Sequence, residues 1–472
     1  MTRTVHAFTD DALGALDAVG VAERIRNGEI SAAEAVDAAI ARVSAVDPDL
    51  VAVQFRAFDQ ARAEAQKPLG SGRFAGVPSF VKDNVDVRGM PTCYGSAAVR
   101  PHPAKNDGPP ARQFRAGGFI FLGKTTMPEF GLTATTEHID RPPTRNPWNL
   151  DRSAAGSSGG TAALVAAGAV PIAHGNDGGG SIRIPAAVNG LVGLKSTRAR
   201  LLDQPGARQL PINIVGEGAL TRTVRDCAHH LAAMEAAFPA KGLPSVGLVE
   251  GPSKRRLRIG LLSKTVADAP IHDETLRVLN EGADTLAALG HEIVEIDVPT
   301  YDRFPEDFTR YWAMFAVLMS VSMQANHRQH FDPRKLDRFT KALAVKWFRG
   351  GLSNIPALRR LRGETASYRR TFENLDVVLS PTLCHPAPPI GELGPDVEID
   401  VLLERLENYV GFTPFNNVGG GPAISVPSGM MAANLPGSLH ISADHGDERT
   451  LLELAYELEA ANPFPRIQDA AT

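Results

Sequence analysis

The sequence predicts an α/β protein built on a β-sheet, and three segments carry this prediction. Apolar, strand-like residues lead to Lys82 within 74–87, which indicates a strand that ends in a turn. A strand, a helix and a second strand are expected at 257–262, 273–289 and 292–298, and this β-α-β unit is expected to join the same sheet. The N-terminal part of the chain is mostly helical and is expected to cover one face of that sheet.

The remaining elements follow from capping and from the spacing of apolar residues. Ser31-Ala32-Ala33-Glu34 is a capping box that begins a helix. Glycine, proline, serine and basic residues gather at 242–254, which is the best candidate for a linker. The other expected elements are helices at 55–66 and 111–116, a strand at 119–122, a buried helix at 161–168, a helix within 219–234 after Thr221, helices over 304–368, a strand at 376–379, and a helix at 448–459.

Composition excludes several classes of protein. The chain has 472 residues, of which 43% are apolar, and its net charge is −4. This balance offers no electrostatic basis for binding nucleic acid or an anionic membrane, and no apolar run approaches the ~18 residues of a spanning helix. Residues 1–11 lack the apolar core of a signal peptide. Cys93, Cys227 and Cys384 are few and far apart, so we expect reduced thiols in a cytoplasmic protein.

The most informative stretch runs from Gly156 to Pro185. A Gly-Ser-Ser-Gly-Gly run opens it, and a run from Gly175 to Pro185 with three successive glycines before Ser181 closes it. Glycine allows a positive φ and a close approach of the backbone to another group. A glycine run that ends in serine can therefore turn several N–H groups toward one point beside the hydroxyl. That arrangement suits a nucleophile with an oxyanion hole built from the main chain.

Two other interpretations of these loops remain open at this point. Glycine-rich loops before helices bind phosphate, although residues 156–161 have neither Walker spacing nor a G-x-G-x-x-G motif after a clear strand. The loops could also be two ordinary glycine-rich turns of a sheet protein. The pairing of the two loops with one upstream lysine favours the catalytic interpretation.

That lysine is Lys82, which follows apolar residues and is therefore expected to emerge from the sheet interior. Buried lysines are rare, and burial disfavours the ammonium form and lowers the pKa. A free lysine with a pKa of ~10.4 is charged at neutral pH and cannot accept a proton. A buried lysine with a pKa of ~7–8 can act as a general base.

Together these motifs resemble the amidase signature family. The resemblance is carried by Gly-Val-Pro and Val-Lys-Asp-Asn around Lys82, by the Gly-Ser-Ser-Gly-Gly run, by Asp-Gly-Gly-Gly-Ser-Ile-Arg-Ile-Pro-Ala, and by the separation of Ser157 from Ser181. It implies that Ser181 is the nucleophile, that Ser157 is a bridging serine after a cis peptide bond, and that Lys82 is the terminal base. It also implies an oxyanion hole made by the N–H groups of Gly178, Gly179, Gly180 and Ser181.

Ser158, Asp177 and Arg183 are expected to support this site. Asp177 and Arg183 flank the nucleophile, and we expect them to fix the loop by hydrogen bonds or an ion pair rather than to act on the substrate. Two departures from the family pattern, a third glycine at Gly178 and Ser-Ala-Ala at 153–155, resemble a branch that includes AmiC-type bacterial amidases. The nylon-oligomer hydrolases are a more distant relation.

The resemblance extends from the Ser31 helix to Glu459 and implies the fold of the family. This is a large mixed, mostly parallel twisted β-sheet covered by helices on both faces. The length would allow two or three domains, but α/β enzymes often use it as one, and we expect a single amidase domain. Its expected parts are N-terminal helices (1–70), a catalytic core (71–235), a β-α-β unit with a helical, aromatic-rich substrate cap (255–380), and C-terminal strands and helix (381–472).

The implied activity is hydrolysis of a small-molecule carboxylic acid amide to carboxylate and ammonia or amine. The enzyme would act on linear C–N bonds without a metal or other cofactor, and a homodimer is expected at the level of the family. One alternative is the glutaminase (A) subunit of a tRNA-dependent amidotransferase, but that branch usually has glutamine at the position of Ile184. Another is a catalytically silent amide-binding relative, which the presence of all three relay residues disfavours.

Other reactive side chains are discounted. Cys93 has no histidine near it in sequence, and Cys384 and its neighbour His385 lie on an irregular segment. Adjacent histidines on the expected helix point apart, so His229 and His230 do not predict a metal site. The family commonly has Gly-Leu-Pro followed by a glutamine near the C-terminus. The corresponding segment of this chain, residues 434–440, is Asn-Leu-Pro-Gly-Ser-Leu-His. Because this segment has histidine and no glutamine, the usual glutamine contact is not predicted. The aromatic residues of 304–368, namely Trp312, Phe315, Phe339, Trp347 and Phe348, belong either to simply packed core or to a substrate-facing cap. The layout of the family implies that the acyl pocket draws on this region.

Overall fold

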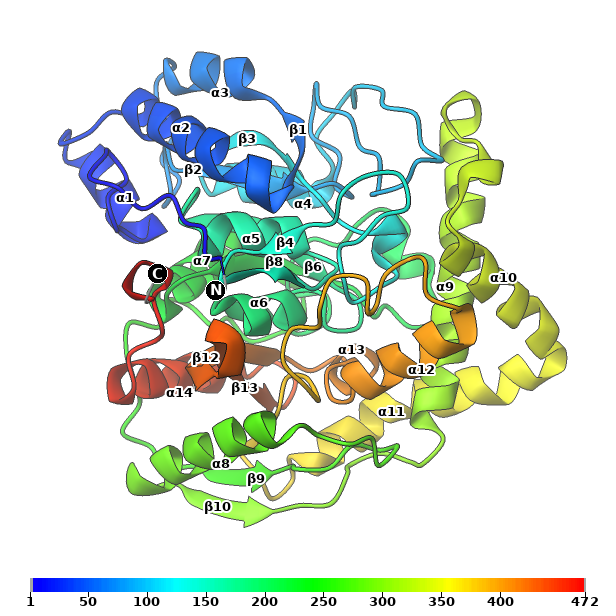
Figure 1. Ribbon diagram of the computed structural model, residues 1–472. Coiled ribbons are helices and arrows are strands. Elements are labelled where there is room, and N and C mark those ends of the chain that lie inside the picture. The colour runs from blue at the N-terminus through cyan, green and yellow to red at the C-terminus, as the bar shows by residue number, and fades with distance from the viewer. Residues whose placement is uncertain (1–2, 471–472) are drawn as a thin grey trace.

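The computed structural model describes residues 3–470, and its central feature is an eight-stranded sheet (Figure 1). The strand order is β10-β9-β11-β13-β12-β7-β8-β6. Helices surround the sheet, so the predicted α/β class is confirmed. The strands are β6 (Ile172–Asp177), β7 (Val192–Lys195), β8 (Gly216–Thr221), β9 (Arg258–Leu261), β10 (Glu292–Glu295), β11 (Val377–Ser380), β12 (Ala423–Met431) and β13 (Leu435–Ala443).

The sheet is mixed, as expected, but its pairings are not mostly parallel. β10 with β9 and β9 with β11 are parallel, whereas the other pairings within this sheet are antiparallel. The parallel pair β9–β10 encloses a crossover helix, α8 (Asp273–Ala288), as the predicted β-α-β unit requires. β12 and β13 are joined by residues 432–434 alone, and a connection that short permits only antiparallel pairing.

A smaller sheet carries Lys82 to the site. It has the order β1-β3-β2, with β1 at Val53–Arg56, β2 at Pro78–Lys82 and β3 at Ile120–Thr125. β2 lies beside β6, and the Ser79 hydroxyl donates to the carbonyl of Ile172 at 2.9 Å. Because Ser79 meets the start of β6 and Lys82 meets Asn176 near its end, both strands reach the same edge. β4 (Arg145–Asn146) and β5 (Asn149–Ser153) form a separate two-stranded sheet.

Helices cover both faces of the main sheet. In β13, Leu439 packs toward Gly282 of α8, whereas its neighbour His440 contacts Arg183 of α6 (Arg183–Asn189). Successive side chains of a strand point to opposite faces, so α8 and α6 lie on opposite sides. Contacts between helices extend the first layer to α14 (Glu448–Ala461) and α7 (Val224–Ala237), and the second to α5 (Gly159–Ala166) and α2 (Ala32–Leu50).

A helical cap extends from the middle to the right of Figure 1, away from the N-terminal helices. It contains α9 (Phe304–His327), α10 (Arg338–Gly350), α11 (Asn354–Thr371), α12 (Ile399–Tyr409) and α13 (Pro414–Gly419). The prediction of helices over 304–368 is therefore confirmed, with a break between α9 and α10. The sequence did not predict α12, although it becomes part of the pocket wall.

Most of the other local predictions are confirmed, and several boundaries are wrong. The Ser31 capping box is present, α14 and β11 lie where expected, and residues 242–254 contain no helix or strand. The expected helix at 55–66 is instead strand β1 followed by α3 (Phe58–Ala65), because pairing with β3 extends residues 53–56. Residues 216–221 form strand β8, and α7 begins only after Thr223, whose hydroxyl caps it. Two further helices are α1 (Ala18–Arg26), which was missed, and α4 (Pro109–Ala116).

No helix within residues 3–470 combines the length and the apolar character needed to cross a membrane.

Candidate active site

Lys82 ends β2 in an environment that water does not reach. Its side chain is fully buried, and Nζ lies 2.7 Å from Ser157 Oγ, 3.0 Å from Ser158 Oγ and 2.7 Å from Asn176 Oδ1. Burial lowers the pKa of Lys82 to about 7, and the carboxylates of Glu217 and Asp177 only partly oppose this shift. A neutral amine is therefore accessible near physiological pH.

The first serine turn delivers two hydroxyls to this amine. Ser157 and Ser158 precede α5, and the peptide bond between Gly156 and Ser157 is cis, as expected. A side chain at Gly160 would place Cβ 2.5 Å from the carbonyl oxygen of Ala52, so glycine is required for the turn to pack this closely. Asn176, which the motifs did not predict as a site residue, is a further partner of Lys82.

Ser181 lies in the second glycine loop, between β6 and α6. It is 8% exposed and faces a pocket that Gly156 and Gly179 also line. Within residues 3–470, its hydroxyl makes no hydrogen bond, including to Ser157. The structure thus brings Lys82 and Ser157 into direct contact and leaves the Ser181 hydroxyl open to the pocket.

The predicted oxyanion donors need one correction. The N–H of Gly180 donates to Asp177 Oδ1 at 2.7 Å, so it is already used to hold the loop. The N–H groups of Gly178, Gly179 and Ser181 have no acceptor among the described residues. Sequence alone could not distinguish these amides, because the direction of each N–H depends on the φ and ψ angles of the loop.

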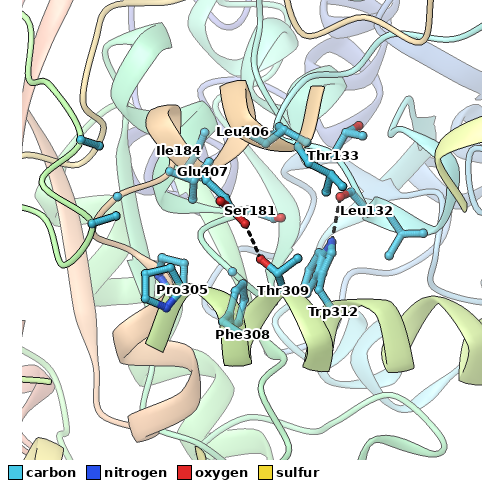
Figure 2. A pocket seen from close by; sticks show the side chains of 18 of the residues that line it. Leu132, Thr133, Ser181, Ile184, Pro305, Phe308, Thr309, Trp312, Leu406 and Glu407 are labelled. Atoms are coloured by element: carbon cyan, nitrogen blue, oxygen red, sulfur yellow. Dashed lines mark hydrogen bonds between the residues drawn. The ribbon is translucent and has the colours of Figure 1, made fainter. Parts of the chain in front are cut away.

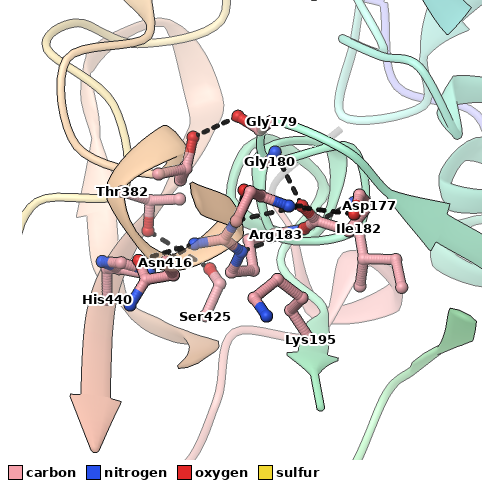
Figure 3. Close-up of polar contacts among 12 residues, drawn as sticks. Asp177, Gly179, Gly180, Ile182, Arg183, Lys195, Thr382, Asn416, Ser425 and His440 are labelled. Atoms are coloured by element: carbon pink, nitrogen blue, oxygen red, sulfur yellow. Dashed lines mark hydrogen bonds and ion pairs between the residues drawn. The ribbon is translucent and has the colours of Figure 1, made fainter. Parts of the chain in front are cut away.

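An ion pair buried beneath the loop fixes its shape (Figure 3). Arg183 Nε donates to Asp177 Oδ2 and Nη2 donates to Oδ1, each at 2.9 Å, and both side chains are fully buried. Burial alone would raise the pKa of Asp177, but the guanidinium of Arg183 holds it well below its usual value. Asp177 also accepts from the N–H of Ile182. These contacts agree with the expected supporting role.

His440 joins this network from β13. Arg183 Nη1 lies 3.0 Å from His440 Nε2, and a guanidinium can only donate, so Nε2 is the unprotonated nitrogen. Nδ1 therefore carries the proton and donates to Ser380 Oγ at 3.0 Å. Burial and Arg183 both lower the pKa of His440 well below its usual value, which keeps the ring neutral. In the segment where glutamine is common in the family, this chain thus uses histidine to accept from Arg183.

Two other lysines are fully buried but do not reach the serines. Lys195 Nζ donates to the carbonyl of Ser196 at 3.0 Å, and burial lowers its pKa to about 7. Lys124 Nζ donates to the carbonyl of Val85 and to the Thr92 hydroxyl. A shifted pKa is therefore common to several groups, whereas contact with the serine turn is specific to Lys82.

The discounted groups remain unsuitable as nucleophiles or metal ligands. The cysteines are free and buried, and burial raises the pKa of Cys93 to about 12 and that of Cys384 to about 11. A thiol in such surroundings is inert at neutral pH. No group of three or more potential metal ligands lies together in the described part of the chain, and neither His229 nor His230 takes part in one.

The pocket in front of Ser181 is mainly apolar (Figure 2). Of the aromatic residues expected from 304–368, Trp312 and Phe339 line it, whereas Phe315 and Trp347 pack in the cap and Phe348 is 70% exposed. Residues outside that range complete the wall, because α12 and the segments around it fold against α9. These additional lining residues include Val266, Leu403, Leu406, Glu407, Val410 and Phe415.

We expect Arg183→Met to destabilise the fold strongly. The substitution leaves Asp177 charged and unpaired in the interior, which costs about 3–5 kcal/mol of unfolding free energy. Urea denaturation at neutral pH measures the loss. The control is Arg303→Met, which breaks an exposed pair with Glu306 and should change stability by less than about 1 kcal/mol. Equal losses in the two variants would contradict the structural role of the buried pair.

A buried lysine beside a serine turn at an apolar pocket suits a hydrolase with an activated serine. The comparisons with known proteins identify its family. A family model described as Amidase matches residues 34–452, and the chain belongs to the amidase family. Its activity is amide hydrolysis.

Individual relatives cover almost the whole chain. Putative amidase AmiC of Mycobacterium tuberculosis (strain ATCC 25618 / H37Rv) is 46% identical over 471 residues, which cover 98% of both chains. A 6-aminohexanoate-cyclic-dimer hydrolase of Paenarthrobacter ureafaciens is 36% identical over 480 residues, which cover 95% of both. A solved structure of 6-aminohexanoate cyclic dimer hydrolase has a TM-score of 0.85 at 31% identity and covers 98% of this chain and 100% of that one. The expected resemblance to AmiC-type amidases is confirmed.

Proposed function

We propose that Ser181 is the nucleophile of this amidase and that Lys82 activates it through Ser157. The observation that carries the proposal is the 2.7 Å contact between the buried Lys82 Nζ and Ser157 Oγ, beside a loop whose serine faces the pocket. Neutral Lys82 accepts the proton of Ser157, which takes the proton of Ser181 as Ser181 Oγ attacks the amide carbonyl carbon. We further propose that a hydrogen bond between the hydroxyls of Ser157 and Ser181 forms when substrate binds.

The proton then returns along the same path to the amine that leaves. An amide nitrogen is a poor leaving group as an anion, so it must be protonated before the C–N bond breaks. Water attacks the acyl group on Ser181, and Lys82 again accepts a proton through Ser157. The carboxylate is released and the serines regain their hydrogens. Each step balances with only water as co-reactant, and no metal or other cofactor takes part.

The oxyanion of the tetrahedral intermediate is held by the free N–H groups of Gly178, Gly179 and Ser181. One such donor typically contributes roughly 3–4 kcal/mol to the stability of the transition state. Gly180 acts indirectly, because its N–H holds the loop to Asp177. Ser158 contacts both Lys82 and the carbonyl of Asn176, and we assign it a positioning role.

We propose that the substrate is a linear carboxylic acid amide with an apolar acyl group. The pocket walls are contributed mainly by aromatic and aliphatic side chains such as Trp312, Phe308 and Leu406. Apolar walls with few polar groups favour ligands that bury apolar surface. The related cyclic-dimer hydrolase supports an extended aliphatic acyl chain. We also propose that the protein acts in the cytoplasm, with buried free thiols, and as a homodimer.

A panel of amides tests the proposed function. The chain, purified without partner subunits, should release ammonia or amine from simple aliphatic and aryl amides. Turnover of glutamine alone would favour the glutaminase alternative. A folded protein that binds amides but cleaves none of them would favour the silent relative and reject the proposal.

We expect Gly180→Ala to impair catalysis far more than Gly178→Ala. Gly180 has a φ of +126°, and a Cβ there would lie 2.3 Å from Thr413 Oγ1, so alanine must displace the loop. A shift of this kind lowers kcat by about 100-fold or more. At Gly178 the nearest atoms would be 3.6 Å from the new Cβ, and kcat should fall by less than about tenfold. Similar losses, measured by amine release, would contradict the assigned loop geometry.

A further inference from the structure

We propose that Glu407 makes this amidase selective for substrates whose apolar acyl chain ends in a cationic group, such as an ammonium. The inference rests on the proposed function and adds a feature that the apolar walls alone do not supply. The occupant is thus an amide with a carbonyl at Ser181, an apolar stretch along the walls, and a positive charge at the far end.

Glu407 differs in charge from the other residues that line the pocket. Among the described residues that line the pocket, it is the only one with a charged side chain. The other polar groups on side chains of the lining are the hydroxyls of Ser181, Thr133, Thr265 and Thr309 and the indole N–H of Trp312, which already donates to the carbonyl of Leu132. An anionic group at the wall of an otherwise apolar pocket favours ligands of opposite charge.

The carboxylate has no cation of its own. Within residues 3–470, no lysine, arginine or histidine forms an ion pair with Glu407. Its neighbour Arg405 on α12 instead donates to the carbonyl of Glu392. On α9, Asp307 is paired with Arg360 outside the pocket lining. The negative charge of Glu407 is therefore uncompensated in the pocket.

One hydrogen bond holds the carboxylate at the wall. Thr309 Oγ1 donates to Glu407 Oε1 at 2.8 Å and joins α9 to α12 across the pocket (Figure 2). Thr309 is 9% exposed, so the donor is fixed by packing. The second carboxylate oxygen, Oε2, makes no hydrogen bond with any described residue and remains available to a ligand.

Glu407 is exposed to solvent, which is consistent with this role. Water solvates the free carboxylate, and an apolar ligand would remove part of that water without replacing its hydrogen bonds. An ammonium replaces them with a charge-assisted hydrogen bond, which is roughly twice as strong as a neutral one. Sites built to bond a polar ligand group also discriminate strongly against analogues that lack it.

The test uses pairs of anilides that differ only at the end of the acyl chain. A homologous series of ω-aminoacyl p-nitroanilides is compared with the alkanoyl p-nitroanilides of equal length at neutral pH, where a primary amine with a pKa of ~10.4 is protonated. At the chain length that reaches Glu407, wild-type kcat/KM should favour the amino compound by about 10- to 100-fold.

Glu407→Gln should abolish this preference. Glutamine keeps the length of the side chain and an oxygen that accepts from Thr309, so the variant removes the charge and leaves the link between α9 and α12 in place. The control is Glu404→Gln, an exposed carboxylate on the same helix that does not line the pocket, and it should retain the wild-type preference. A preference equal in wild type and Glu407→Gln, or absent in wild type at every chain length, would overturn the proposal.

A binding measurement separates this proposal from the proposed function. Calorimetric titration of Ser181→Ala and of Ser181→Ala/Glu407→Gln with the same anilides measures the preference without turnover. Loss of the preference in the double variant supports the role of Glu407 even if anilides are not cleaved. Normal cleavage of neutral anilides without any cation preference would leave the proposed function intact and reject the role of Glu407.

Discussion

Replacement of Ser181 by alanine should lower kcat by roughly 10⁴- to 10⁶-fold, the range typical of removing the nucleophile of a serine hydrolase. The expected loss is this large because the other hydroxyls among the described lining residues belong to threonines, none of which is hydrogen-bonded to Lys82. Cys93 and Cys384 are buried thiols with raised pKa values, and Ser157 is bonded to Lys82. The variant should still bind amides, since the pocket walls are unchanged.

The assignment of Ser181 can be checked by covalent labelling as well as by rate. A fluorophosphonate should add one phosphonyl group to the wild-type protein, and peptide mass mapping should find it on Ser181. Ser181→Ala should not be labelled. Thr133→Ala, which removes another hydroxyl of the same pocket, should retain both labelling and turnover. An adduct on Ser157, on a cysteine or on another serine would reject Ser181 as the nucleophile.

The second large effect is expected at Lys82, whose substitution by methionine should lower kcat/KM by about 10²- to 10⁴-fold. Methionine keeps an unbranched side chain in the buried site but cannot accept a proton. Lys82→Arg should be similarly inactive, because a guanidinium stays charged. Retention of wild-type activity by either variant would show that the serines are activated by another group.

The wild-type pH profile should report the same amine. Burial lowers the pKa of Lys82 to about 7, and only the neutral form accepts a proton. Below this pKa the neutral fraction falls tenfold per pH unit, so kcat/KM should rise with pH to about 7 and then level off. The residual activity of Lys82→Met should lack this rise with pH, the acidic limb of the profile.

Lys195 provides a matched control for the pH profile. It is also fully buried with a pKa lowered to about 7, but it bonds the carbonyl of Ser196 rather than a serine hydroxyl of the site. Lys195→Met should therefore keep the acidic limb of kcat/KM. Loss of the acidic limb in Lys195→Met, or its persistence in Lys82→Met, would show that Lys82 is not the group whose titration shapes the profile.

Local sequence patterns predicted the elements that depend on near neighbours. Alternation of strand and helix in 257–298 predicted the β-α-β unit, and the Ser31 capping box marked the start of α2. The apolar run before Lys82 predicted its burial correctly. These predictions succeed because capping, periodicity and strand burial are set within a few residues.

The same patterns were less informative wherever distant segments meet. The start of the helix predicted at 55–66 instead belongs to strand β1, because the edge of β3 offers residues 53–56 a partner. The direction of the pairings in the main sheet depends on how distant strands such as β7 and β12 come together. His440 was recognised as a departure from the family, yet its bond to Arg183, 257 positions away, became visible only in the structure.

The sequence by itself determined the chemical groups of the site: a lysine after an apolar strand and two serines in glycine-rich turns. Only the tertiary structure decided which of these groups touch, which amide of the loop is already bonded, and that Glu407 meets Thr309, 98 positions away, at the pocket wall. The physical reason is that side-chain chemistry and backbone permissiveness are local properties. Contact, desolvation and the direction of an N–H group depend on the path of the whole chain.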